Sequence, residues 1–547
     1  MKIVNLYINS KKVTVILVLL NFIMINWVSN GLYMRFDLSK SGRFKLTNAS
    51  KKILRELPEN VTIEAFFSDE VPDLYLHSVK ELKDFLTEYA SISRGKVKLR
   101  FLNPDSDEDI KKRASALGIR PMPIGAVDQN KREVSNVYFS LALSFENQTQ
   151  VIPDILRNNQ VLEYNLTSRI YKMAHPEERV VGIVSGNSGF TTEESQNKFQ
   201  SYSILNNSME AFYGIMTPVS MDSQNIPDNV SVLFLVSPQM LSDKEKYHLD
   251  QYILRGGKLV VATSGVNIDF NTGSVNPKDQ GTMEFFQNLG INIGSNLIIE
   301  PENFVPLRRQ VNLFQVLEIP YPVWLSIPED SLSQKSLITS GMESLFMPWA
   351  SSITLDETKI KEPQVEILAK SSSKSWIKSE SLSISPDALK NEIEAPAPND
   401  AKEYQAAYMI KGKFNSFFKD KKLPVSDTNF ISESVQEASL VVVSTPFMFS
   451  DSAIQQSQGL NLNFFLSALD VLNGLDELVV ARNRKVSTPM MDAKPSWLKS
   501  FIILINILAP LIIFVGYGMM HFLQRKKNQS KEFNDWREMN TMEKAGN

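Results

Sequence analysis

The sequence predicts an α/β protein that is anchored in a membrane at both ends. Two observations lead to this fold class. An apolar segment long enough to cross a membrane lies near each end of the chain. Between them, short strand-like apolar runs alternate with segments in which apolar residues recur at helical spacing. The chain has 547 residues, which is enough for about three or four folded units.

The apolar segment near the C-terminus, residues 497–521, predicts a transmembrane helix. Residues 501–520 carry no charge and are interrupted by Asn506 and Pro510. About 20 residues at a rise of 1.5 Å cross the hydrocarbon core of a bilayer. Trp497 precedes the segment and a basic cluster follows it, which is the usual pairing at the two membrane surfaces. A buried soluble helix is the alternative, but it would need apolar surroundings on every side for about five turns.

The apolar segment near the N-terminus, residues 13–34, predicts another transmembrane helix after a short cytoplasmic N-terminus, residues 1–12. Lysines precede it, so a cleaved signal peptide is the competing interpretation. A signal peptide ends in small residues at its cleavage site, and Val28-Ser29-Asn30-Gly31 is a poor substitute for them. The apolar character also continues through Met34. We therefore expect an uncleaved anchor.

Two membrane helices with one large region between them place both chain termini on the same side of the membrane. The basic cluster Arg525-Lys526-Lys527 after the second helix indicates that this side is the cytoplasm, which also holds the tail at residues 522–547. Residues 35–495 are then outside the cytoplasm. An amide without a hydrogen-bond partner is costly in lipid, so polar residues within the helices are candidate contacts with partner helices. These candidates are Asn21, Asn26 and Asn506.

Residues 35–175 predict a small α/β unit with the element order of a thioredoxin-like domain. After a short amphipathic helix, the order is β-α-β-α-β-β. The expected elements are a strand at 61–67, a helix at 74–89, a strand at 96–102, a helix capped by Ser106 and ended by Gly118, and a hairpin of 137–145 with 149–153. The redox site of such domains needs a Cys-x-x-Cys pair, and the chain has no cysteine. The unit is therefore expected to be a scaffold.

Residues 176–384 predict a doubly wound, Rossmann-like domain, because apolar strands and helices alternate there. Ser242 and Glu245 form a capping box for a helix that runs to Arg255, and Gly256-Gly257 ends that helix. The expected strands are 179–185, 230–236 and 258–263. Ligands of such sheets bind beyond the C-terminal ends of the strands. The corresponding loops follow Ser185, Val236 and Thr263.

Residues 385–402 predict a flexible linker, and residues 403–495 the C-terminal part of the same domain. The linker carries three prolines among acids and amides, a composition typical of a mobile loop. An amphipathic helix is expected at 461–472. Arg482 and the basic residues after it are expected to lead towards the membrane.

No motif supports a catalytic, cofactor or metal site. The lack of cysteine excludes thiolate chemistry, and the four histidines have no spacing that suits metal ligands on one helix. Gly186-Asn187-Ser188-Gly189 has Phe190 where a nucleophile elbow needs its second glycine. The sequence has no phosphate-binding loop, so the chain is not expected to hydrolyse ATP. His175 and His248 are expected to be solvated.

Segments along nearly the whole chain carry a resemblance to one protein family: Phe44–Leu57, Val61–Ser68, Leu162–Ile170, Tyr252–Leu259, Ile410–Ser416, Ser439–Phe447 and Asn463–Leu472. In this order, and together with both membrane segments, they resemble the GldG-like family. Its members are auxiliary components of ABC-type transport systems associated with gliding motility.

This resemblance implies a subunit without ATPase activity in a bacterial inner membrane, with its main domain in the periplasm. It would work beside a separate permease subunit and, through it, a separate ATPase subunit. The family's large domain is similar to the sheet of class I glutamine amidotransferases, without their catalytic residues. Where the family is expected to have an acidic residue after a late strand, this chain has Ser444-Thr445-Pro446, so a polar site there is expected to be lost.

The expected function is therefore that of a non-catalytic accessory subunit of a gliding-motility-type ABC transporter complex. Its expected partners are the permease, the ATPase and membrane lipid, and no cofactor is expected. A net charge of −3 gives no reason to expect nucleic acid. Two alternatives stay open: a tethered extracytoplasmic domain that binds or senses a ligand, and a hydrolase or transferase with an unrecognised site.

Overall fold

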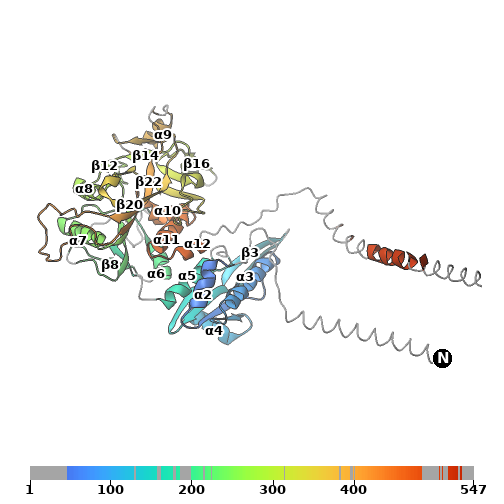
Figure 1. Ribbon diagram of the computed structural model, residues 1–547. Coiled ribbons are helices and arrows are strands. Elements are labelled where there is room, and N and C mark those ends of the chain that lie inside the picture. The colour runs from blue at the N-terminus through green and yellow to red at the C-terminus, as the bar shows by residue number, and fades with distance from the viewer. Residues whose placement is uncertain are drawn as a thin grey trace, which may run out of the picture. The chain divides into compact units, whose positions relative to one another are not determined.

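The structure is a computed structural model (Figure 1). It describes residues 46–128, 131–156, 162–175, 180–184, 199–213, 216–222, 225–312, 315–380, 383–394, 398, 401–482, 504, 508, 515–527 and 530–531. The chain divides into two compact units, Met1–Lys485 and Val486–Asn547. The first unit contains two main sheets with helices on them, so its fold is mixed α/β, as the sequence predicts.

The N-terminal sheet has four strands in the order β2-β1-β5-β6. β1 (Val61–Phe67) pairs in parallel with β2 (Val97–Leu102) and antiparallel with β5 (Phe139–Phe145), which pairs antiparallel with β6 (Gln148–Ile152). Its helices are α2 (Asn48–Glu56), α3 (Asp73–Ile92), α4 (Glu108–Ala116) and α5 (Leu162–Ala174). A hairpin of β3 (Met122–Asp128) and β4 (Lys131–Val137) precedes β5. The predicted hairpin of the last two strands is confirmed.

The two faces of this sheet are unequal. Ile63 and Phe67 of β1 belong to the larger apolar cluster, which α3 and α5 cover with residues such as Leu86 and Leu166. Phe66 points the other way, into a small cluster with Ala114 of α4. Side chains on a strand alternate between its faces, so β1 supplies both clusters.

The larger sheet has nine strands, ordered β13-β19-β22-β23-β10-β9-β7-β8, with β20 paired to β22. Its parallel part consists of β8 (Thr217–Val219), β7 (Val180–Val184), β9 (Val230–Val236), β10 (Lys258–Ala262) and β23 (Ala438–Val443). Its antiparallel part consists of β22 (Gln405–Lys413), β20 (Lys361–Lys370), β19 (Ile353–Leu355) and β13 (Ile291–Ile293). The three strands predicted from apolar runs are β7, β9 and β10, adjacent and parallel as expected.

Helices cover both faces of the parallel part. On one face lie α6 (Ser203–Tyr213), α10 (Asp451–Gln456) and α11 (Leu460–Leu472), and on the other α7 (Asp243–Leu254) and α8 (Gln280–Asn288). In β9, Phe234 packs into the first core while Leu233 and Leu235 pack into the second. A strand buried on both faces has no polar alternation, which is why these strands are continuous apolar runs in the sequence.

The remaining elements extend this domain. Antiparallel pairs are formed by β11 (Val266–Ile268) with β12 (Val275–Pro277), β14 (Leu297–Ile299) with β21 (Trp376–Lys378), β15 (Leu307–Asn312) with β16 (Gln315–Ile319), and β17 (Trp324–Pro328) with β18 (Ser344–Pro348). The other helices among the described residues of this unit are η2 (Glu329–Ser331), η3 (Glu357–Lys359), α9 (Pro386–Glu394), η4 (Phe447–Phe449) and α12 (Asp476–Arg482).

The predicted ends of α7 are confirmed in detail. The Ser242 hydroxyl accepts from the backbone N–H of Glu245, and the Glu245 carboxylate accepts from the backbone N–H of Ser242 at 2.8 Å. Gly256 has φ +90, a conformation that L side chains rarely adopt. A Cβ on Gly257 would lie 2.5 Å from the Tyr252 ring. The two glycines therefore serve backbone geometry and packing.

Two secondary-structure predictions in this unit were wrong. Residues 386–394 of the predicted linker 385–402 form helix α9, because Pro386 takes a first-turn position and Leu389 is buried in the apolar cluster beneath it. The N-cap of α4 is Asp107, whose side chain accepts from two backbone N–H groups, and not Ser106.

Both predicted membrane segments lie largely outside the described residues. This holds for all of residues 13–34, including Asn21 and Asn26, and for Asn506. Of residues 497–521, only 504, 508 and 515–521 are described, and they are helical. Among the helices that the structure describes, none is both long and apolar enough to cross a membrane.

Candidate functional site

The C-terminal edge of the parallel strands is the candidate site, because the direction of strand addition reverses there. From β7 the chain passes to β8 on one side, and then to β9, β10 and β23 on the other. The crevice outside the strand ends at such a reversal is where doubly wound sheets bind ligands. Of the three predicted loops, those after Val236 and Thr263 are described, and the loop after Ser185 lies outside the described residues.

A small cavity of about 90 Å³ lies at this edge. Residues after three parallel strands line it: Ser237 and Gln239 after β9, Ser264 after β10, and Pro446 and Phe447 after β23. The other lining residues are Gln200, Tyr202, Val266, Asn267, Ile268 and Phe270. The structure therefore brings together two of the strand ends that the sequence predicts and adds a third, after β23.

Ser237 adopts an unusual backbone conformation at the cavity. Its φ is +43, in the left-handed region that costs a non-glycine residue about 1–2 kcal/mol. Its N–H donates to the Ala262 carbonyl oxygen at 2.8 Å, which ties the end of β9 to the end of β10. Residues held in this way are concentrated at functional sites, so Ser237 is the strongest single indication that the cavity has a role.

The wall formed by Tyr202 is fixed by buried polar contacts. The Tyr202 hydroxyl donates to the Pro446 carbonyl oxygen at 3.1 Å, and burial raises the pKa of this hydroxyl, with a smaller contribution from Asp451. Asp451 accepts from the hydroxyls of Ser201 and Ser203 at 2.6 and 2.5 Å and from the N–H of Ile204 at 2.8 Å. The carboxylate of α10 thereby positions the start of α6 against the cavity.

Aromatic rings pack behind the cavity. Phe270 and Phe447, which line it, have ring centroids 5.5 Å apart, and each lies 5.3 Å from the Trp349 ring. Phe199 and Trp324 continue the cluster, with centroids 4.8 and 5.8 Å from Trp349. This edge-to-face packing makes one side of the cavity rigid and apolar.

Among the described residues that line the cavity, no pair is arranged for acid–base or nucleophilic catalysis. Apart from Tyr202, the described residues that line it carry no ionisable group. The Ser237 hydroxyl is approached by the amide nitrogen of Gln239 at 3.5 Å, and an amide does not act as a general base. What the lining offers is amide and hydroxyl hydrogen bonding beside apolar rings, which suits an uncharged polar ligand.

Lys278 is a buried cation near the end of β10, and no sequence motif singles it out. It is 5% exposed, and its Nζ donates to Thr263 Oγ1 at 3.1 Å. Burial lowers its pKa to about 8. Lys278 is not among the residues that line the cavity. A lysine shortly before a helix is typical of a surface position, so only the tertiary structure shows its burial.

The other residues considered from the sequence have structural roles or lie outside the described residues. His248 is buried, and its Nδ1 lies 2.6 Å from the Met221 carbonyl oxygen, so the prediction of a solvated side chain was wrong. His175 is partly exposed and stacks on Tyr171. Residues 186–190 are outside the described part of the chain. After β23, Thr445 is fully buried and donates to the Pro348 carbonyl oxygen at 2.6 Å.

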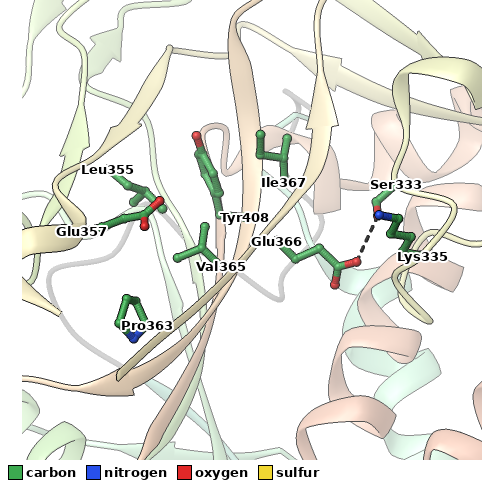
Figure 2. A pocket seen from close by; sticks show the side chains of 9 residues that line it. All are labelled: Ser333, Lys335, Leu355, Glu357, Pro363, Val365, Glu366, Ile367 and Tyr408. Atoms are coloured by element: carbon green, nitrogen blue, oxygen red, sulfur yellow. Dashed lines mark hydrogen bonds between the residues drawn. The ribbon is translucent and has the colours of Figure 1, made fainter. Parts of the chain in front are cut away.

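A larger groove, of about 570 Å³, follows the edge strand β20 (Figure 2). Val365, Ile367 and Tyr408 form its floor, and Glu366 points to Ser333, with a hydrogen bond of 3.0 Å. Pro363 lies in the strand, whose register with β22 is interrupted by bulges. Proline and bulges are devices that keep an edge strand from pairing with another chain. The groove therefore gives no specific indication of a ligand.

The family of the chain is established by comparison with known proteins. Residues 178–470, more than half of the chain, match the family of auxiliary components described as "ABC-type uncharacterized transport system". The protein belongs to this family and is thus an auxiliary component of an ABC-type transport system. Residues 40–144 match a domain of unknown function, DUF7088.

Individual similar proteins do not refine this assignment. An uncharacterized protein of Borreliella burgdorferi is 24% identical over 521 residues, which cover 90% of this chain and 94% of that relative. The mmIFT52 N-terminal domain is 11% identical with a TM-score of 0.31, covering 54% of this chain and 97% of that one. A putative ThuA-like protein from Bacteroides uniformis is 12% identical with a TM-score of 0.26, covering 53% and 91%. Both TM-scores are below 0.5, so the likeness to either structure is weak.

Proposed function

We propose that this protein is a non-catalytic subunit of a GldG-like ABC transporter complex, anchored by two membrane helices, with residues 35–495 in the periplasm. The single observation that carries this proposal is the family match over residues 178–470. A membrane permease and a cytoplasmic ATPase are the proposed partners. The first described sheet is proposed to be a thioredoxin-like scaffold, and the second a Rossmann-like domain without catalytic residues.

The packing of the first and last described helices of the larger unit supports anchoring at both ends. α2 follows the first apolar segment in the chain, and α12 precedes the second. Ile53 of α2 and Leu478 of α12 belong to one buried apolar cluster, and Lys52 Nζ lies 3.2 Å from Glu477 Oε1. The first and last described helices of this unit are therefore neighbours, which is compatible with two membrane helices inserted close to each other.

Cysteine accessibility in intact cells tests this topology. The native chain has no cysteine, so each introduced cysteine reports on its own position without background. Ser10→Cys and Ser530→Cys should resist a membrane-impermeant maleimide until the cells are opened, while Lys422→Cys, at an exposed position, should react once the outer membrane is permeable. Labelling of Ser10→Cys or Ser530→Cys before the inner membrane is opened would contradict the proposal.

The membrane amides provide a test of partner binding. Asn21→Leu, Asn26→Leu and Asn506→Leu together remove the proposed hydrogen bonds to permease helices while leaving both segments apolar. We expect the amount of co-purified permease to fall several-fold at equal expression. The control is Asn534→Leu, which lies in the predicted tail and should change nothing. Equal recovery with the triple variant and the control would remove this role from the three amides.

A second candidate function is the binding of a small uncharged ligand at the strand-end cavity. The specific observation in its favour is the left-handed backbone of Ser237 beside the amide and hydroxyl groups of the lining. Thermal unfolding of the full chain, with a panel of neutral small polar compounds, tests it. A compound that stabilises the protein should lose its effect in Asn267→Leu, which fills the cavity wall with an apolar side chain. A shift retained in Asn267→Leu would place binding elsewhere.

A further inference from the structure

A buried ion pair joins α12 to the helices around it. Arg482 of α12 is 5% exposed, and its Nη2 donates to Oδ2 of Asp470 on α11 at 2.6 Å. Its Nη1 donates to Ser467 Oγ at 2.8 Å, and its guanidinium also donates to the Tyr164 hydroxyl of α5. The guanidinium carbon lies 3.9 Å from the centroid of the Tyr164 ring. Burial lowers the pKa of Arg482 well below its ordinary value.

The Asp470 carboxylate accepts hydrogen bonds from helices of both domains. The Tyr164 hydroxyl of α5 donates to Oδ2 at 3.1 Å, and the Tyr213 hydroxyl of α6 donates to Oδ1. Nζ of Lys172, also on α5, lies 3.9 Å from Oδ1 and 3.4 Å from the Tyr213 ring centroid. A single carboxylate thus connects α5, which packs on the N-terminal sheet, with α6, α11 and α12, which belong to the larger domain.

The apolar part of this junction is small. Its buried members are Ile53, Tyr164, Leu475 and Leu478, a far smaller set than the cluster on either face of the large sheet. The exposed Lys52–Glu477 pair adds little, because solvent screens it. A helix as short as α12 is marginal by itself in water, so its place depends on the contacts it makes.

We propose that helix α12 holds the two domains together, and that the ion pair between Arg482 and Asp470 keeps α12 in place. When the ion pair is intact, α12 holds α2 and α5 of the N-terminal domain against α11. When the pair is broken, α12 detaches and the N-terminal domain separates, while the core of the large sheet stays folded.

Hydrogen exchange of the full-length chain in detergent tests this role of α12 and its ion pair. The central variant is Asp470→Asn. The change keeps the shape of the side chain but leaves Arg482 buried without a counter-charge, which is strongly destabilising. We expect exchange in α12, α2 and α5 to rise on the order of 100-fold. Exchange in β9 and β10 should stay within about twofold of the native chain.

A matched control distinguishes a local effect of the Arg482–Asp470 ion pair from a general loss of stability. Asp250 of α7 is a fully buried carboxylate that accepts from Ser416 Oγ at 2.7 Å and from the Phe417 N–H at 2.8 Å. Asp250→Asn should leave exchange in α2, α5 and α12 unchanged. Unchanged α12 exchange in Asp470→Asn, or a rise that includes β9 and β10 equally, would overturn the proposal.

A crosslink across the junction gives an independent readout. Lys52→Cys with Glu477→Cys places two thiols on α2 and α12 in a chain without native cysteine, within reach of a short bismaleimide. In the Asp470→Asn background, closing this crosslink should restore slow exchange in α5 as well as in α12. If α5 still exchanges rapidly after complete crosslinking, α12 does not hold the N-terminal domain, and the proposal fails.

Discussion

Lys278 shows how a single residue links burial to pH dependence. Its charge is desolvated, and no carboxylate contributes to its shifted pKa. In the folded chain that pKa is about 8, against 10.5 for an ordinary lysine. Between these two pH values the unfolded chain binds more protons than the folded chain, so the free energy of unfolding must rise with pH in this window.

Lys278→Met should remove this rise. The native chain is expected to gain about 3 kcal/mol from Lys278 between pH 8 and 10.5, whereas the variant gains nothing from this position. At pH 7 the variant should be more stable by about 2 kcal/mol, because methionine has no charge to desolvate. Urea unfolding of both chains at pH 7 and pH 10 measures the difference. Identical pH dependence in the two chains would show that Lys278 is not buried with a depressed pKa.

Ser237 allows a test of stored backbone strain. Ser237→Gly should stabilise the chain by about 1 kcal/mol, since glycine has no Cβ to oppose a φ of +43. Ser231, within the same strand β9, is the matched control, and Ser231→Gly should destabilise by about 0.5–1 kcal/mol. Opposite signs in urea unfolding are expected, and a loss of stability in both variants would argue against strain at Ser237.

At the scale of the element, helix α7 depends on its capping box. Ser242→Ala removes the acceptor for the Glu245 N–H and should cost about 1 kcal/mol of unfolding free energy. The control is Ser208→Ala within α6, where the hydroxyl bonds the Ile204 carbonyl oxygen and alanine is the better helix former. If Ser208→Ala lowers the free energy of unfolding as much as Ser242→Ala does, the capping box contributes no more than an ordinary helical serine.

The elements were predictable where the pattern of the sequence is local. β9 and β10 are continuous apolar runs because both of their faces are buried, and α7 carries both end signals. Helix α9 was missed because Pro386 and the acids that follow it suggest a loop, while burial of Leu389 decides its structure. The hairpin β3–β4 was missed because Pro123 and Gly125 weaken its strand pattern.

The candidate site was predictable only in its location. Parallel strands bring their ends together, so the loops after Val236 and Thr263 could be placed on one edge. The left-handed Ser237, the buried Lys278 and the Asp470–Arg482 pair could not be predicted. Their environments come from residues far apart in the chain, such as Tyr164 and Arg482, which are 318 positions apart. Arg482 was expected on the way to the membrane and is instead buried.

At the scale of the whole molecule, the described part of the larger unit begins and ends with two helices, α2 and α12, that are in contact. The junction between its two domains lies on the same short helix, α12. Family membership makes the chain an auxiliary component of an ABC-type transport system.

The decisive experiment for the proposed subunit role is an affinity purification of the full-length protein from its native membrane in mild detergent, followed by mass spectrometry of the proteins that accompany it. We expect a permease and an ATPase of the ABC type, each in a fixed ratio to this chain. The triple asparagine variant serves as the specificity control. Recovery of the protein alone, stable and monodisperse, would contradict the subunit role and make the strand-end cavity the leading site of function.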